Sequence, residues 1–177
     1  MKLTTPNSSL SDFHGSWNDV TGIDAPLYYQ GWGNEEFNVH SCVQNWLDGG
    51  GTRDKINIGL PFYGRSFLSA TGLNQHHGGS DTIHWGQDEG TPQYFNIVAR
   101  LGEMTQEWDE ATWTQWAYFN DGGGLISFDN EAAICAKTEF VQQHNLNGFI
   151  IWELSGVSRC LLSPIFLSFF LLFSSSR

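Results

Sequence analysis

The chain has 177 residues, which is one domain or part of one, and its 40% apolar and 15% aromatic content excludes wholesale disorder. Eight Lys and Arg stand against 19 Asp and Glu, a net charge of −11 that would repel a phosphate backbone, so nucleic acid is not expected as a partner. A neutral sugar polymer is compatible with this charge, and it suits the eight Trp because flat rings stack on the apolar faces of pyranoses.

The first helix is predicted in the stretch NVHSCVQNWLDGGG, residues 38–51. Apolar residues recur there at the spacing of one helix face, at Val39, Cys42, Val43, Trp46 and Leu47. Asn38 is a plausible N-cap, and Gly49–Gly51 ends the helix. A buried strand follows in KINIGLPFYGR, running through Leu60 and ended by Pro61, with a loop beyond it. A helix joined to a strand by a short turn is the repeating unit of an α/β fold.

The middle of the chain has a different pattern. GTPQYFNIVARLGE predicts a helix with Thr91 as its cap, Pro92 at its first position and Gly102 at its exit. TWTQWAYFNDGGGLISFDN alternates in the manner of a strand and then turns at Asp121-Gly122 into a second strand, which predicts a hairpin. We therefore expect a small α+β insert over residues 66–128.

The helix and strand unit recurs near the end of the chain. Residues 130–148 predict a helix capped by Asp129 or Asn130, with one side formed by Ile134, Lys137, Thr138 and Val141. The closing strand, Phe149-Ile150-Ile151, is a continuous apolar run typical of a strand buried on both faces. It ends in Trp152 followed directly by Glu153.

The last segment, residues 157–177, differs from everything before it. Residues 160–173 are apolar apart from two Ser and Pro164, a run shorter than the ~20 residues that span a bilayer. A membrane anchor is one interpretation. We favour a translated non-coding segment foreign to the fold, since Val157-Ser158 can be encoded by the usual start of an intron. Residues 1–11, MKLTTPNSSLS, contain no apolar stretch, so a secretory signal is not expected there.

The cysteines and histidines show no metal-binding spacing. Cys42, Cys135 and Cys160 are expected as buried thiols or at most one disulfide, and the state of Cys42 and Cys135 stays open. His76, His77 and His84 lie in a glycine-containing loop, which favours solvated side chains over a metal site. Neither a metal nor a cofactor is expected.

Polar and aromatic residues stand at three predicted strand ends, where α/β folds gather their functional groups. Asp12 opens DFHGSW, Tyr63 and Arg65 follow the first buried strand, and Trp152 ends the last one. Taken singly, each has an ordinary structural explanation, because a Trp at a strand end usually packs in the core.

Three motifs together carry a resemblance: DFHGSWNDVTGIDAPLYY, KINIGLPFYGRSF and GFIIWELSG. In this order and spacing they resemble family 18 glycoside hydrolases, the chitinases, especially those of arthropods. The resemblance covers residues 12–156 and implies part of a (β/α)8 barrel. Residues 12–65 would run from the end of strand six to strand seven, residues 66–128 would form the chitinase insertion domain, and residues 129–156 would supply the last helix and strand eight. Residues 1–11 would then be foreign or disordered.

The resemblance also implies roles for five residues. Asp12 matches a catalytic Asp that helps to stabilise the positive oxazolinium intermediate formed by the substrate's own acetamido group. Trp152 matches the Trp that forms the floor of the subsite for the cleaved sugar. In the family, a cis peptide bond often follows this Trp. Trp17 matches a sugar-stacking Trp, and Tyr63 and Arg65 match cleft residues. The implied partner is chitin or chito-oligosaccharides. The resemblance also implies an extracellular location and a monomeric protein.

Departures from the family pattern shape the functional prediction. The family's strand-four motif, Asp-x-x-Asp-x-Asp-x-Glu, is absent from this sequence, and its Glu is a general acid of a kind that contributes about 10²–10⁴-fold. Asn96 stands where the insert usually offers a Glu, and Ser11 replaces a Tyr. We expect a chitinase fragment, inactive alone. The alternatives are a non-catalytic, lectin-like chitin-binding protein and a chain that does not fold stably.

Overall fold

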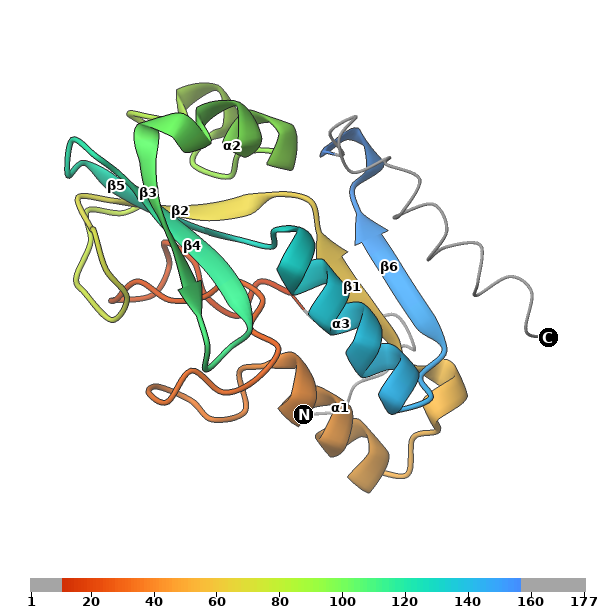
Figure 1. The fold of residues 1–177 in the computed structure, drawn as a ribbon. Helices are drawn as coiled ribbons and strands as arrows, with labels where there is room; N and C mark the ends of the chain where they lie inside the picture. Colours follow the sequence, from red (N-terminus) through yellow and green to blue (C-terminus); the bar gives the residue numbers. More distant parts are fainter. Residues whose placement is uncertain (1–10, 157–177) are drawn as a thin grey trace.

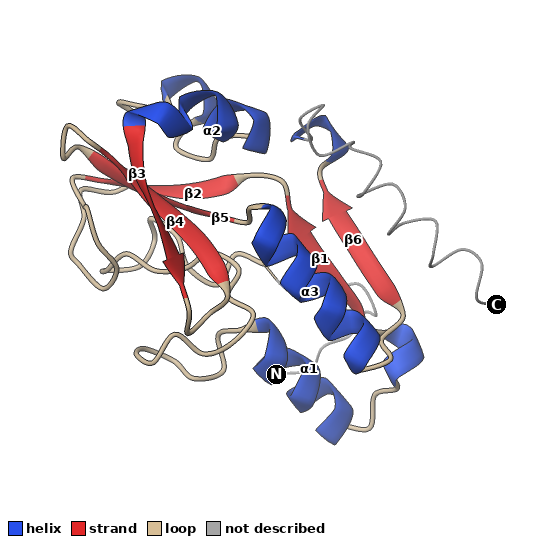
Figure 2. Ribbon diagram, viewed as in Figure 1, coloured by secondary structure: helices blue, strands red, loops and turns tan. Residues whose placement is uncertain are grey.

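The computed structural model describes residues 11–156. The expectations for residues 1–10, for the apolar tail at 157–177 and for Cys160 fall outside the described residues. The fold is mixed α/β, with a two-stranded parallel sheet and a four-stranded antiparallel sheet (Figure 2). Within residues 11–156, no helix is long and apolar enough to cross a membrane.

The parallel sheet joins β1 (Asn57–Pro61) to β6 (Gly148–Trp152), with Pro61 paired to Trp152 at its carboxyl end. Helices α1 (Val39–Asp48) and α3 (Glu131–Gln143) pack against it (Figure 1). Both predicted helices are confirmed. Asn38 accepts from the Ser41 amide, and Asn130, not Asp129, caps α3 by accepting from the Ala133 amide.

The core beneath this sheet takes Val39 and Val43 from the predicted face of α1. From α3 it takes Ala136 and Phe140, which were not predicted, as well as the predicted Val141. Its buried members are Leu27, Val39, Val43, Ile56, Ile58, Ala136, Phe140, Val141 and Leu146. The prediction of full burial for β6 is wrong, because Phe149, Ile150 and Ile151 are only half-buried. The physical reason is that, within the described part of the chain, β6 pairs with β1 alone.

The antiparallel sheet has the strand order β2-β5-β4-β3, with β2 (Gly64–Leu68), β3 (Met104–Asp109), β4 (Thr114–Phe119) and β5 (Gly124–Phe128). The β4–β5 hairpin around Asp121-Gly122 is confirmed. Two strands were not predicted. β2 occupies the place of the expected loop after Pro61, and β3 pairs with β4 along the edge of the sheet.

Helix α2 (Tyr94–Arg100) starts later than predicted. Thr91 is not its cap: its hydroxyl instead accepts a hydrogen bond of 3.0 Å from Arg65. Pro92 is not its first residue, because the Pro92 carbonyl accepts from the Gly64 amide at 2.9 Å, and Gln93 bridges to Tyr63. Extended pairing with the start of β2 therefore keeps residues 91–93 out of the helix, and Gly102 lies in the 3₁₀ turn Leu101–Glu103.

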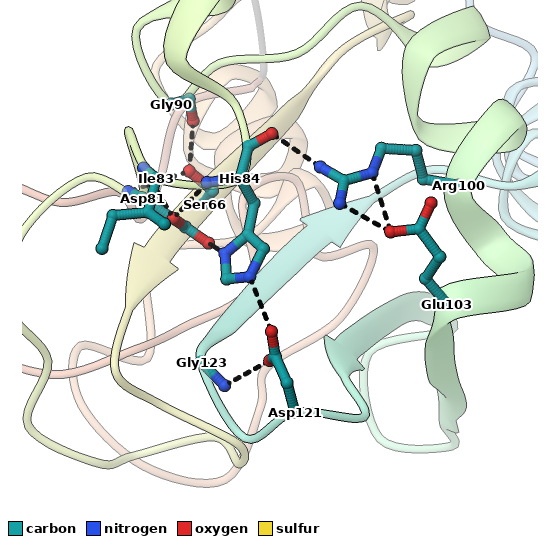
Figure 3. A network of polar contacts seen from close by, with 9 residues as sticks. All are labelled: Ser66, Asp81, Ile83, His84, Gly90, Arg100, Glu103, Asp121 and Gly123. Carbon is teal, nitrogen blue, oxygen red and sulfur yellow. Dashed lines mark hydrogen bonds and ion pairs between the residues drawn. The ribbon is translucent and has the colours of Figure 1, made fainter.

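His84 is embedded in a polar network beside the four-stranded sheet (Figure 3). Its Nδ1 lies 2.6 Å from Asp81 Oδ2 and its Nε2 lies 3.2 Å from Asp121 Oδ2. Its ring stacks on Phe119 at 3.8 Å, and Arg100 donates to its carbonyl. The prediction of a solvated His84 is therefore wrong, since the ring links the loop before α2 to the β4–β5 turn.

The remaining histidines and cysteines with sequence-based expectations differ in burial. His76 is exposed and half-buried His77 packs edge-on against Phe67, with ring centroids 5.0 Å apart. Cys42 and Cys135 are free thiols, the first half-buried and the second exposed, so the expectation of buried thiols holds for neither in full. Within residues 11–156, no group of three His, Cys, Asp or Glu is placed to hold a metal ion.

Candidate functional site

Three of the residues nominated from the sequence meet in one cluster. Asp12 Oδ1 accepts hydrogen bonds from Arg65, one from Nε at 2.8 Å and one from the second terminal nitrogen. Asp12 Oδ2 accepts a hydrogen bond of 3.0 Å from the Tyr63 hydroxyl. Both oxygens of the carboxylate are thus oriented by partners that lie about fifty residues away along the chain.

The junction of the two sheets places this cluster. The chain leaves β1 at Pro61 and enters β2 at Gly64, so Tyr63 and Arg65 follow the carboxyl end of a parallel strand. Because side chains alternate along an extended chain, residues 63 and 65 point to the same face. Asp12 lies in an irregular segment: within the described residues, 11–38 contain no strand, only a bridge from Val20 to His76.

Trp17 joins the cluster through Arg65. The guanidinium carbon lies 5.1 Å from the Trp17 ring centroid and 5.4 Å from that of Tyr63, within the range of cation–π contacts. Trp17 nevertheless remains 56% exposed. A large indole face is therefore held by a charged neighbour and still open to a ligand.

Trp152 lies at the end of β6 with 64% of its surface exposed, so it is not a core residue. Its carbonyl accepts a hydrogen bond of 2.8 Å from the amide of Phe62, the residue that precedes Tyr63. This bond holds the Trp152 backbone next to the segment that carries Tyr63. The peptide bond between Trp152 and Glu153 is cis, as the resemblance implied. The sheet register thus holds Trp152 beside the strand that leads into the Tyr63 and Arg65 segment.

The surroundings set the charge states of the two partners of Asp12. Burial is the main cause that raises the pKa of Tyr63 well above its ordinary value, so the hydroxyl stays protonated and can donate. Burial alone would lower the pKa of Arg65, but the hydrogen bond and charge of Asp12 outweigh it and the net pKa rises.

Sequence reasoning missed Asp24, which contacts Asp12 directly. The Asp12 amide donates to Asp24 Oδ1 at 3.1 Å, and Asp24 is 1% exposed. A signal was available in the sequence: an acidic residue within the apolar run from Ile23 to Leu27 needs a buried partner. Asn96, on α2, donates a hydrogen bond of 2.9 Å to the Asp88 side chain.

Comparisons with known proteins agree on one family. The model described as glycosyl hydrolases family 18 matches residues 9–156. Chitinase 1 of Aphanocladium album is 32% identical to this chain, over 81% of the chain and 34% of its own length. Probable chitinase 10 of Drosophila melanogaster is 30% identical, over 81% of the chain and 6% of its own length. The chain thus spans about a third or less of these relatives.

Solved structures give the same picture of the fold. The Ostrinia furnacalis group IV chitinase has a TM-score of 0.79 and 26% identity, covering 93% of this chain and 48% of that chain. A Cycas revoluta family 18 chitinase, solved in complex with (GlcNAc)3, has a TM-score of 0.78 at 22% identity, covering 91% and 45%. At that identity the second likeness speaks for the fold alone.

Proposed function

The chain belongs to the glycosyl hydrolases of family 18, and we propose that it forms one side of the sugar-binding site of a chitin-hydrolysing glycosidase. The carrying observation is the Asp12 carboxylate, held by Arg65 and Tyr63 next to the exposed ring of Trp17. The proposed ligands are β-1,4-linked N-acetylglucosamine chains, the polymer on which the relatives named chitinase act.

We propose that the parallel strands β1 and β6 are strands seven and eight of a (β/α)8 barrel. Parallel pairing with helices packed on the sheet is the arrangement that such a barrel repeats. The antiparallel sheet would belong to the insertion domain over residues 66–128, since it interrupts the sequence between those two strands. Residues 12–65 and 129–156 would then be the barrel segments on either side.

The chemistry proposed for Asp12 is electrostatic. Hydrolysis assisted by the substrate's acetamido group builds positive charge near the anomeric carbon, and a fixed carboxylate stabilises that charge better than mobile water does. Tyr63 keeps its proton because burial raises its pKa, so it would donate a hydrogen bond and not add a second negative charge. Trp17 and Trp152 would offer flat apolar faces to the sugar rings.

We further propose that this chain binds sugar but does not hydrolyse it. The sequence contains no Asp-x-x-Asp-x-Asp-x-Glu motif, and so no match for the family's general acid. The same observation supports the second candidate, a lectin-like protein that binds chitin without cleaving it. Either protein would meet its insoluble substrate outside the cell, and binding through one cluster requires only a monomer.

Retention on chitin beads tests the binding proposal. We expect the chain to be retained and Trp152→Ala to be retained about tenfold less, a loss of about 1.4 kcal/mol of the size expected for an aromatic contact. Trp113→Ala is the matched control, because Trp113 is also exposed, at 44%, but lies in the β3–β4 turn. Equal retention of the chain and Trp152→Ala would count against the proposal, and release of reducing sugar would refute the lack of hydrolysis.

A further inference from the structure

Asp24 makes hydrogen bonds to three residues in two other segments of the chain, through three different atoms. Its Oδ1 accepts from the Asp12 amide at 3.1 Å, and its carbonyl accepts from the Phe13 amide at 2.8 Å. Its own amide donates to the Ser127 hydroxyl on β5 at 2.9 Å. One buried residue therefore links the Asp12 segment to the antiparallel sheet.

The Asp12 backbone needs such support. Its φ is +63°, in the left-handed region that non-glycine residues adopt only at a cost. The direction of the Asp12 side chain depends on this backbone conformation being held. Ser127 is also the cross-strand neighbour of Arg65, so the same contacts set the position of Asp12 relative to its main partner.

The surroundings of the Asp24 carboxyl favour its neutral form. Its Oδ2 is buried and has no hydrogen-bond partner within the described residues, and an ionised carboxylate would leave that oxygen's charge unsatisfied. Burial, and next the charge of Asp12, raise the pKa of Asp24 well above its ordinary value. The other charged groups that face it are Arg65, Asp129 and Lys137.

We propose that Asp24 is a positioning residue: a neutral carboxylic acid whose hydrogen bond to the Asp12 amide directs the Asp12 carboxylate toward Arg65 and Tyr63. For sugar binding, this inference rests on the proposed function. The placement of Asp12 itself does not. A merely structural buried acid would affect stability and leave the Asp12 and Arg65 contact unchanged.

The first test compares thermal unfolding of the chain with Asp24→Asn across pH. If the pKa of Asp24 is higher in the folded than in the unfolded state, its protonated form stabilises the fold. This stabilisation is complete at pH values below the ordinary carboxyl pKa of about 3.9, and it is lost as the pH rises through the raised pKa of the folded state. The amide cannot ionise, so the melting temperature of Asp24→Asn should gain on that of the unsubstituted chain as pH rises. Asp19→Asn, an exposed aspartate of the same segment, should follow the unsubstituted chain. Parallel curves for Asp24→Asn and the unsubstituted chain would overturn the inference.

The second test observes the Asp12 and Arg65 contact directly. The Arg65 Nε–H resonance in a nitrogen-15 spectrum should keep its position in Asp24→Asn, which retains the acceptor oxygen. It should move in Asp24→Ala, which does not. If Asp24→Ala does not fold, Ser127→Ala removes the other end of the link and should shift the same resonance. An unmoved resonance in a folded Asp24→Ala or Ser127→Ala variant would contradict the positioning role.

Binding of a soluble N-acetylglucosamine oligomer separates this inference from the proposed function. We expect the affinity of Asp24→Asn to lie within about threefold of that of the unsubstituted chain. Asp24→Ala should bind about tenfold more weakly than the unsubstituted chain, and Ser127→Ala about threefold more weakly. If no form binds sugar but the pH dependence and the resonance behave as stated, the proposed function fails and the positioning role stands. If sugar binds equally to all forms, the positioning role fails.

Discussion

Arg65 makes several polar contacts around Asp12, and we expect it to matter more for sugar binding than for stability. It contacts Asp12 through two nitrogens and Thr91 through a third, and it lies over Trp17. The side chains of Arg65 and Asp12 are 25% and 39% exposed, so water screens their attraction. The planar guanidinium instead contributes orientation, because it holds one carboxylate oxygen from two directions.

Replacing Arg65 with Lys should separate these two contributions. We expect Arg65→Lys to lower the free energy of unfolding by less than about 1 kcal/mol, as is usual for exposed pairs. Affinity for a chito-oligosaccharide should fall about tenfold, since a lysine cannot fix the carboxylate from two directions. Calorimetric titration and urea unfolding measure the two effects, with Arg53→Lys as control because the Arg53 side chain donates to the His144 carbonyl and not to Asp12. A large loss of stability at unchanged affinity would contradict this account.

Asp12, Tyr63 and Arg65 were nominated from predicted strand ends together with the family resemblance, and the structure brings them into contact. Asp12 itself lies in an irregular segment, so the position of a residue at a strand end was informative only for Tyr63 and Arg65. Asp24 was missed because its partner Ser127 is 103 residues away, a distance that no local pattern reveals. The roles proposed for these residues in sugar binding stay predictions.

Among the elements, α3 depends on an unusual buried ion pair. Lys137 is 0% exposed and pairs with Asp129, which follows the last residue of β5. Burial raises the pKa of Asp129, and the charge of Lys137 opposes that rise. Each charge is tolerated in the core because the other is beside it.

Removal of one partner should therefore be costly. We expect Lys137→Met to lower the free energy of unfolding by about 3–5 kcal/mol at neutral pH, because it leaves Asp129 buried and unpaired. The raised folded pKa of the stranded carboxyl means that the loss should shrink as pH falls and Asp129 becomes protonated. Denaturant unfolding at neutral and acidic pH measures this. The double variant Lys137→Met with Asp129→Asn should recover part of the stability, and Lys55→Met on the exposed surface should change little.

The elements differ in how much of their structure their own sequence encodes. Helices α1 and α3 were predictable because each buries a stripe at helical spacing. Strand β3 has a mostly exposed or half-buried pattern in MTQEWD and is defined by pairing with β4, so its sequence alone gave little signal. The start of α2 was mispredicted because contacts to β2 compete with local capping by Thr91.

At the scale of the molecule, one core connects the two sheets. It includes Leu60 and Phe62 at the end of β1, Phe119 and Phe128 of the antiparallel sheet, and Ile134 of α3. Because these side chains are buried together, we expect the described region to unfold as one cooperative unit.

A substitution in the antiparallel sheet tests this cooperativity. Phe119 is 3% exposed and packs on Trp85 and His84, so Phe119→Ala should cost about 3–5 kcal/mol. The far-ultraviolet and near-ultraviolet transitions should shift to lower temperature together. Phe95→Ala, on α2 at 43% exposure, should shift them little. Two separated transitions would show that the antiparallel sheet unfolds independently.

We infer that the exposed indoles of Trp17 and Trp152 face a bound amino sugar. Titration of the nitrogen-15-labelled chain with a soluble N-acetylglucosamine oligomer, followed through the indole N–H resonances, tests it most directly. We expect the resonances assigned to Trp17 and Trp152 by single Phe substitutions to shift with saturation, while that of Trp85, 3% exposed, stays in place. Indole resonances that all remain unmoved at high oligomer concentration would contradict it.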